Sequence, residues 1–89
     1  MKTNYKPSFL KELKTLRGTP FFEKINQVVF EEIPSLDRFE DLQNCKKILG
    51  HAIHFRIRVG DYRIGFYVEN ETIFFMRVGH RSQFYRTFP

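Results

Sequence analysis

The sequence has few cysteines and no long apolar segment. It has one cysteine, Cys45, so no disulfide can form within the chain, which fits a reducing compartment. We expect Cys45 to be a small core residue rather than a reactive thiol. No apolar run approaches the roughly 18 residues of a membrane span, and the first residues lack the apolar core of a signal peptide. These absences predict a cytoplasmic protein with no membrane partner.

Several catalytic motifs are also missing. The histidines are His51, His54 and His80, and they show no metal-ligand spacing with carboxylates. There is no glycine-rich phosphate loop and no serine-centred triad motif. We therefore expect neither a metal nor a cofactor.

Acidic residues are scarce in the second half. Residues 1–44 carry seven Lys or Arg and seven Asp or Glu, whereas residues 45–89 carry eight basic residues and three acidic ones. The whole net charge of +5 therefore lies in the second half. Six of these eight basic residues are arginines, whose planar fork suits phosphate. Charge alone is compatible with nucleic acid binding and equally with a plain soluble surface.

Apolar residues are abundant, and in the first half they recur at helical spacing. With 42% hydrophobic residues and 11 phenylalanines, residues 1–89 are expected to form a single domain. The pattern predicts a helix that Gly18 ends, followed by a second helix with Thr19 as its N-cap and Pro20 in its first turn. These helices form a tight hairpin, and "SLDRFEDL" predicts a further short turn. The expected inward residues are Phe9, Leu13, Leu16, Phe21, Ile25, Val28, Val29, Ile33, Leu36, Phe39 and Leu42.

After Gly50 the hydrophobic period changes from 3.6 to 2, which predicts strands. A short edge strand at residues 2–6 is also expected. Gly60-Asp61 predicts a two-residue hairpin loop, because glycine supplies the positive φ of a primed turn. In that register the apolar pairs are Val59 with Tyr62, Ile57 with Ile64 and Phe55 with Phe66, and the opposite face pairs Arg58 with Arg63, Arg56 with Gly65 and His54 with Tyr67.

The next turn, "ENET", allows two registers. A two-residue loop would direct Ile73, Phe75 and Arg77 to the core face, whereas a three-residue loop would bury Phe74, Met76 and Val78. We favour the three-residue loop because it keeps Arg77 out of the core and on the cationic face, since burying an unpaired charge is costly.

The cationic face of the hairpin indicates an anionic ligand. Like charges directly opposite each other destabilise a sheet. A bound phosphate would supply the missing partner, and Gly65 would leave room for a ligand in the middle of the face. The alternative is that the arginines are splayed in solvent or are paired with acids from the helices.

These residues could perform metal-independent RNA cleavage. The 2′-hydroxyl can attack the adjacent phosphorus if a base, an acid and positive charge for the phosphorane are present. His80 and His54 lie nearest the basic face and titrate near neutrality. Arginines would hold the phosphate, and Tyr85, in a C-terminal turn folded back over the sheet, would stack on a base.

The segments "KKILGH", "FRIRVGDYRIGFYV" and "IFFMRVGHRSQFY", after a helical hairpin, resemble the RelE/ParE toxin superfamily. The resemblance implies an α+β fold: a small, mostly antiparallel twisted sheet with the N-terminal helical hairpin packed on one face. It also implies a type II toxin that cleaves mRNA in the ribosomal A site, a ribosome-dependent endoribonuclease. The implied partners are the ribosome and a cognate antitoxin that forms a hetero-oligomer with the toxin.

Carried over by position, the resemblance predicts a catalytic set. Its members are Arg56, Arg58, Arg63, His80, Arg81 and Tyr85, with Lys46, Lys47, His54 and Arg77 as further RNA contacts. RelE toxins have lysines where this chain has Arg56 and Arg58, and one of those lysines serves as the base. Arginine stays protonated, so His80 is the substitute candidate for proton transfer.

Two other functions share this fold. A ParE-like protein would poison DNA gyrase, although that branch does not need the full arginine and tyrosine set. A non-catalytic, decayed toxin would bind RNA or antitoxin without cutting.

Overall fold

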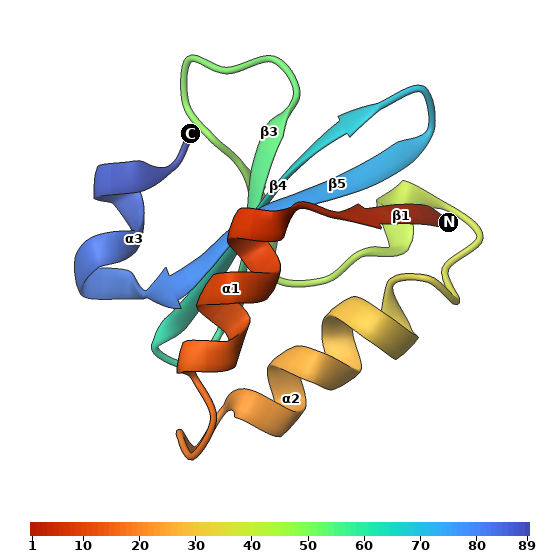
Figure 1. Ribbon diagram of the computed structural model, residues 1–89. Helices are drawn as coiled ribbons and strands as arrows, with labels where there is room; N and C mark the ends of the chain where they lie inside the picture. Colours follow the sequence, from red (N-terminus) through yellow and green to blue (C-terminus); the bar gives the residue numbers. More distant parts are fainter.

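The alternating half of the sequence forms the centre of an open, mixed sheet (Figure 1). In the computed structural model, which describes residues 1–89, β3 (His54–Val59), β4 (Tyr62–Glu69) and β5 (Thr72–His80) are antiparallel neighbours. At one edge, β1 (Lys2–Tyr5) runs parallel to β5, and at the other edge β2 (Cys45–Lys47) is antiparallel to β3. The order β1-β5-β4-β3-β2 confirms the α+β class, with one parallel pair in an otherwise antiparallel sheet.

The β3–β4 hairpin has the predicted register, including Arg58 opposite Arg63. Gly60 has a φ of 57°, whereas Asp61 is not among the residues with positive φ, so the loop fits a type II′ turn with glycine first. Because this turn fixes which side chains share a face, the sequence pattern and the turn chemistry lead to the same register.

The β4–β5 connection combines the two registers that the sequence allowed. The loop has two residues, Asn70 and Glu71, both with positive φ as in a type I′ turn. Ile73 and Phe75 are therefore buried, so the predicted three-residue loop is wrong.

Farther along the strand, an irregularity in the β4–β5 pairing changes which side chains of β5 face the core. Gly65 pairs with Arg77 while the next residue, Phe66, pairs with Phe75, so one residue of β5 is extra. Val78 is consequently buried, whereas Arg77 lies outside the core, as predicted.

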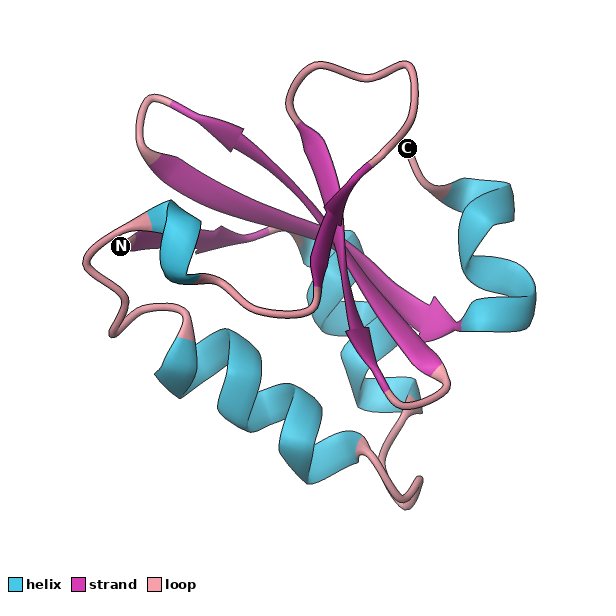
Figure 2. Cartoon of the chain, turned by 180° about the vertical axis from the view of Figure 1, so that it is seen from behind, coloured by secondary structure: helices cyan, strands magenta, loops and turns pink.

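Three helices flank the sheet; a short helical segment continues α2, and a separate short turn precedes β2 (Figure 2). They are α1 (Pro7–Thr15), α2 (Phe22–Gln27), the π-helical η1 (Val28–Glu32), the 3-10 turn η2 (Phe39–Asp41) and α3 (Arg81–Thr87). The predicted N-cap is wrong: α2 begins at Phe22, and the Thr19 hydroxyl donates a 2.7 Å hydrogen bond back to the Leu16 carbonyl at the end of α1.

The helices do not simply form a hairpin on one face, because α1 also covers an edge of the sheet. Beyond the end of β1, the Ser8 hydroxyl donates to the Met76 carbonyl at 2.8 Å, and Glu12 Oε1 accepts from the Val78 N–H at 3.2 Å. These side chains satisfy backbone groups of β5 that a neighbouring strand would otherwise bond.

The core lies between α1, α2, η1 and one face of the sheet, which we call the core face. Phe9, Ile25, Ile64, Phe66 and Phe75 are all 0% exposed, and no buried side chain is polar. Leu36, Phe39 and Leu42 pack against this cluster from the segment around η2, as predicted. None of the helices has the length and apolar character needed to cross a membrane.

Candidate functional site

The opposite face of the sheet carries the predicted cationic residues. We call it the arginine face and define it by seven residues that share one side of the central strands: His54, Arg56, Arg58, Arg63, Gly65, Tyr67 and Arg77. Arg56 lies across from Gly65, which lies across from Arg77, and Arg58 lies across from Arg63. The structure therefore gathers four arginines on one surface.

Arg56 and Arg58 have no acidic partner. The four ion pairs of the protein are Lys24–Glu32, Arg38–Glu40, Arg77–Glu12 and Arg81–Asp61. Arg58 is exposed and Arg56 is half-buried. Acids from the helices thus leave the centre of the arginine face uncompensated.

Arg63 is ordered by the backbone of the hairpin turn. Its Nη1 donates to the Gly60 carbonyl at 2.9 Å and to the Tyr62 carbonyl at 3.0 Å. Its Nε is the buried side-chain nitrogen that lacks a hydrogen-bond partner. A buried N–H without a partner is costly, so this nitrogen is an unsatisfied polar group of the site.

Helix α3 folds back over the middle of the arginine face, as predicted for the C-terminal turn. A Cβ at Gly65 would lie 2.8 Å from ring atoms of Phe84 and Phe88. The expected role of Gly65 is therefore wrong: it admits two phenyl rings of the same chain rather than a ligand. The open position is Gly79, opposite Arg63, where a Cβ would meet no atom within 4 Å.

Arg81 and Tyr85 lie on one side of α3, because they are four residues apart. Tyr85 is 52% exposed, and its ring meets the Phe84 ring edge-on at 5.1 Å. Arg81 Nε lies 3.6 Å from Asp61 Oδ1, and both side chains are more than half exposed. Such an exposed ion pair is weak, and it leaves the Nη groups of Arg81 without an acidic partner.

Arg77 is set apart from the other arginines. Its Nη1 lies 3.4 Å from Glu12 Oε2 on α1. In addition, the rings of Phe84 and Phe88 occupy the space over Gly65, which separates Arg77 from Arg56 in the sheet. Nothing in the sequence spacing indicated that Glu12 would reach β5.

The two lysines of β2 face opposite ways. Lys46 pairs with Arg56 and so shares the arginine face, whereas Lys47 pairs with Phe55 and shares the core-face side. The structure brings Lys46 to the candidate site and leaves Lys47 away from it. β2 itself was not predicted.

His80 occupies the N-cap of α3. Its Nδ1 accepts from the Ser82 N–H at 3.1 Å and lies 2.9 Å from Ser82 Oγ. The register pairs His80 with Tyr62, whose ring it meets edge-on at 5.5 Å, so it lies on the core-face side at the end of β5, next in the chain to Arg81.

His54 lies on the arginine face itself, between the Tyr67 and Phe88 rings, each 5.7 Å away. Partial burial lowers the pKa of the His54 imidazole, and the neighbouring His51 lowers it further. The neutral ring is therefore favoured, which is the form that can accept a proton.

Cys45 and the acidic residues offer no second site. Burial raises the pKa of the Cys45 thiol to about 11, against the opposing charge of Arg56, so the thiol stays protonated and unreactive at neutral pH. No group of three or more His, Cys, Asp or Glu side chains is placed to hold a metal ion.

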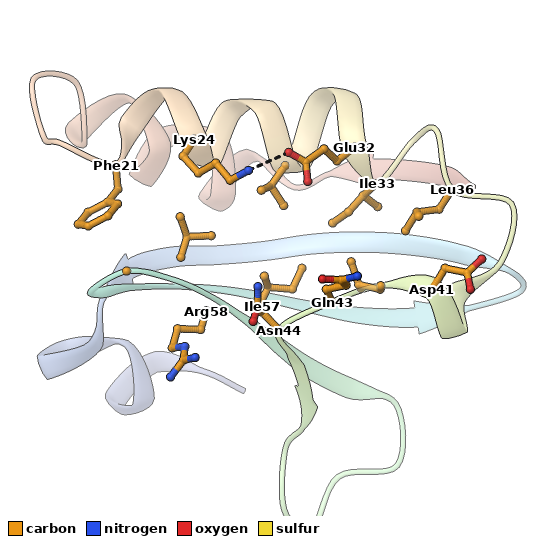
Figure 3. Close-up of a pocket in the computed structure, with 14 residues that line it drawn as sticks. Phe21, Lys24, Glu32, Ile33, Leu36, Asp41, Gln43, Asn44, Ile57 and Arg58 are labelled. Carbon is orange, nitrogen blue, oxygen red and sulfur yellow. Dashed lines mark hydrogen bonds and ion pairs between the residues drawn. The ribbon is translucent and has the colours of Figure 1, made fainter.

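A cavity of about 700 Å³ lies on the other side of the sheet, between α2, η1 and β3 (Figure 3). Half of its 14 lining residues are hydrophobic, and the Lys24–Glu32 ion pair crosses its rim at 3.1 Å. Arg58 lines it but points away from α2 (Figure 3). The chemistry-bearing residues therefore gather on the arginine face and not in this cavity.

Residues 4–85 match the sequence model of the ParE toxin of the type II toxin–antitoxin system, parDE. The chain belongs to the RelE/ParE toxin superfamily. It is 40% identical to toxin RelE3 of Methanocaldococcus jannaschii, over the full length of both chains.

Solved structures agree with this assignment. In the RelB–RelE antitoxin–toxin complex of Methanococcus jannaschii, a chain 36% identical to this one superposes with a TM-score of 0.78, over 97% of this chain and 99% of that one. The RelBE2 toxin–antitoxin complex of Mycobacterium tuberculosis, at 22% identity, gives a TM-score of 0.69 over 90% and 96% of the two chains and shows the shared fold.

Proposed function

We propose that this protein is the toxin of a type II toxin–antitoxin system and cleaves mRNA in the ribosomal A site, which arrests translation. The observation that carries the proposal is the pair Arg56 and Arg58, which have no acidic partner and share one sheet face with Arg63, directly opposite Arg58. Like charges placed opposite each other cost stability. An RNA phosphate provides the counter-charge that the chain itself does not.

Each arginine has a separate task in this proposal. Arg63 and Arg81 hold the scissile phosphate, and Arg56 and Arg58 align it and stabilise the charge of the phosphorane. The ribose 2′-hydroxyl attacks the phosphorus, and the bond to the 5′-oxygen breaks. Tyr85, exposed on the same side of α3 as Arg81, stacks on a base and helps to bring the backbone into line.

His80 is assigned the proton transfer. While its Nδ1 accepts from the Ser82 N–H, the neutral ring carries its proton on Nε2 and cannot act as a base there. When Nδ1–H instead donates to Ser82 Oγ at 2.9 Å, Nε2 is free to take a proton. The two Ser82 groups thus support both forms of the ring. Neutral His54, on the arginine face, is a further RNA contact.

The partners follow from the same proposal. We assign a cognate antitoxin, in a hetero-oligomer like the solved RelB–RelE complex of Methanococcus jannaschii. The ribosome completes the site by constraining the mRNA, so free RNA is cut slowly. The protein acts in the cytoplasm, where ribosomes translate.

Translation in a purified cell-free system, followed by primer extension on the mRNA, tests the proposal. We expect cuts within codons only when ribosomes are present. Arg81→Ala and Arg63→Ala should each reduce cleavage by about 100-fold or more, as loss of a transition-state donor does. Arg17→Ala, a change of an exposed arginine outside the arginine face, is the matched control and should cleave normally.

The outcomes separate the alternatives. Intact mRNA with unimpaired translation would refute the proposal. Binding of RNA or antitoxin without cutting would identify a non-catalytic module. Full activity of both arginine variants at equal expression would show that the phosphate grip is assigned wrongly.

Inhibition of DNA gyrase is the second candidate, because residues 4–85 match the ParE toxin model. A supercoiling assay with purified gyrase distinguishes it. Inhibition that survives Arg56→Ala and Arg58→Ala would favour that function over mRNA cleavage.

A further inference from the structure

The turn between β3 and β4, taken here with Tyr62 at the start of β4 as residues 60–62, holds both arginines of the assigned phosphate grip. The Gly60 and Tyr62 carbonyls accept from Arg63 Nη1 at 2.9 and 3.0 Å. The carbonyl between them, that of Asp61, accepts from the Arg81 backbone N–H at 2.8 Å. Three consecutive carbonyls of one turn therefore connect two arginines that are far apart in the sequence.

This turn is held firmly by its neighbours. A Cβ at Gly60 would collide with the Phe21 ring, which packs directly against the turn from the start of α2. The Tyr62 ring lies 5.9 Å from the Phe21 ring on one side and 5.5 Å from the His80 ring on the other. The turn is therefore a rigid base, which is what a preorganised site requires.

The Asp61 carboxylate meets Arg81 in a way that leaves most of the guanidinium available. Oδ1 lies 3.6 Å from Nε, and no hydrogen bond occupies either Nη group of Arg81. A carboxylate beside Nε limits the directions of the side chain, while the two Nη groups can still donate to a phosphate.

We propose that Asp61 is a positioning residue that orients Arg81 toward the scissile phosphate, with Arg63 fixed by the same turn. This inference rests on the proposed mRNA cleavage and deepens it. Asp61 contacts no substrate and acts through Arg81. Its negative charge also repels RNA, so its removal should weaken the chemical step without weakening binding.

The test is Asp61→Asn, which removes the charge and leaves the Asp61 carbonyl in place. In the ribosome-dependent cleavage assay we expect kcat to fall about two- to five-fold, the range of an exposed ion pair, with KM unchanged or lower. The matched control is Glu71→Gln, an exposed acid in the other two-residue turn, and it should change neither constant.

A double variant shows whether Asp61 acts through Arg81. Arg81→Lys keeps the charge but lacks Nε, so adding Asp61→Asn to it should cause no further fall in kcat. An equal further fall would overturn the proposal. Unchanged kcat with a lower KM for Asp61→Asn alone would also overturn it, since Asp61 would then only repel RNA.

An NMR measurement keeps this test separate from the test of the function. We expect the Arg81 side chain to be less mobile in the unmodified protein than in Asp61→Asn, as the order parameter of its Nε–H measures, because the carboxylate 3.6 Å from Nε limits its directions. Equal mobility in both would refute the positioning role, whatever the activity. Absence of mRNA cleavage by the unmodified protein would instead refute the proposed function.

Discussion

On the core face of the sheet, Ile64, Phe66 and Phe75 are 0% exposed. Their neighbours Arg63, on the arginine face, and Phe74, which pairs with Tyr67 of that face, remain partly exposed. These residues alternate along the same two strands. The core face meets α1, α2 and η1, whereas the rings of Phe84 and Phe88 cover the middle of the arginine face. Stability and the candidate chemistry are therefore assigned to residues one position apart, and substitutions one position apart should affect different properties.

Phe75→Ala should disrupt the packing of the core face and cause the largest loss in the free energy of unfolding. Phe75 lies 5.2 Å from Tyr5, 5.4 Å from Phe9 and 6.0 Å from Phe66, ring to ring. Truncating a buried phenylalanine of this kind costs about 3–5 kcal/mol in the free energy of unfolding. Urea denaturation monitored by circular dichroism measures it.

Phe74→Ala is the matched control for Phe75→Ala. Phe74 packs on Tyr67 at 4.7 Å but is only half-buried, so we expect about half the loss. Equal losses for the two variants would contradict the assignment of Phe74 to the exposed side.

The sequence predicted the β3–β4 hairpin well because two independent signals agreed. The alternation in "HFRIRV" and the turn Gly60-Asp61 both specified the register that the structure has. When independent signals agree in this way, a local structure can be predicted from a single sequence. The face on which Arg56 and Arg58 meet Arg63 was predictable for the same reason.

Other features depend on contacts between distant segments. The extra residue in β5 reverses the alternation after Phe75, so neither loop length alone could place both Phe75 and Val78 in the core. β2 has three residues and no alternating hydrophobic pattern. It forms because it can pair with the edge of β3.

The site's supporting contacts were missed for a similar reason. Asp61 forms an ion pair with Arg81, and Glu12 forms one with Arg77. In each pair the two residues are far apart in the sequence and come together only in the folded protein. The rings that cover Gly65 come from α3 and from Phe88, the residue after it. The sequence indicated that this segment folds back over the sheet without showing which residue it would cover.

Gly60→Ala should damage both faces at once, with the second-largest effect. Gly60 has a φ of 57°, and a Cβ there would meet the Phe21 ring. The left-handed conformation and the overpacking together should cost about 2–4 kcal/mol in the free energy of unfolding. Because the turn holds Arg63 and Arg81, cleavage should fall even at temperatures where the variant is folded.

Gly79→Ala is the control for the glycine comparison. Gly79 has no positive φ, and a Cβ there meets nothing within 4 Å. Its midpoint of unfolding should match that of the unmodified protein. A loss at Gly79 as large as that at Gly60 would refute the role given to the turn.

Arg58→Ala should change stability and cleavage activity in opposite directions. Removing one of two like charges that face each other across β3 and β4 should raise the free energy of unfolding by about 0.2–1 kcal/mol at low salt. The gain should shrink at high salt, where exposed charges are screened. Cleavage should be lost in the same variant.

Arg17→Ala again serves as the control, since Arg17 is exposed and forms no ion pair. Salt should change the stability of Arg17→Ala and that of the unmodified protein by the same amount. A destabilised Arg58→Ala variant would show that the arginine face contributes to folding rather than opposing it.

The smallest predicted effect concerns pH and His54 on the arginine face. The folded protein lowers the pKa of His54 by partial burial and by His51, while the unfolded chain keeps the ordinary value of 6.5. As pH falls below that value, the unfolded chain takes up the proton first, so the stability that neutral His54 contributes is present above about pH 6.5 and is lost as pH falls through its lowered pKa. An NMR titration should place the His54 midpoint below 6.5, and His54→Gln should lose less stability than the unmodified protein between about pH 7.5 and pH 5. A midpoint above 6.5 would mean that a nearby anion, and not burial, sets the charge of this ring.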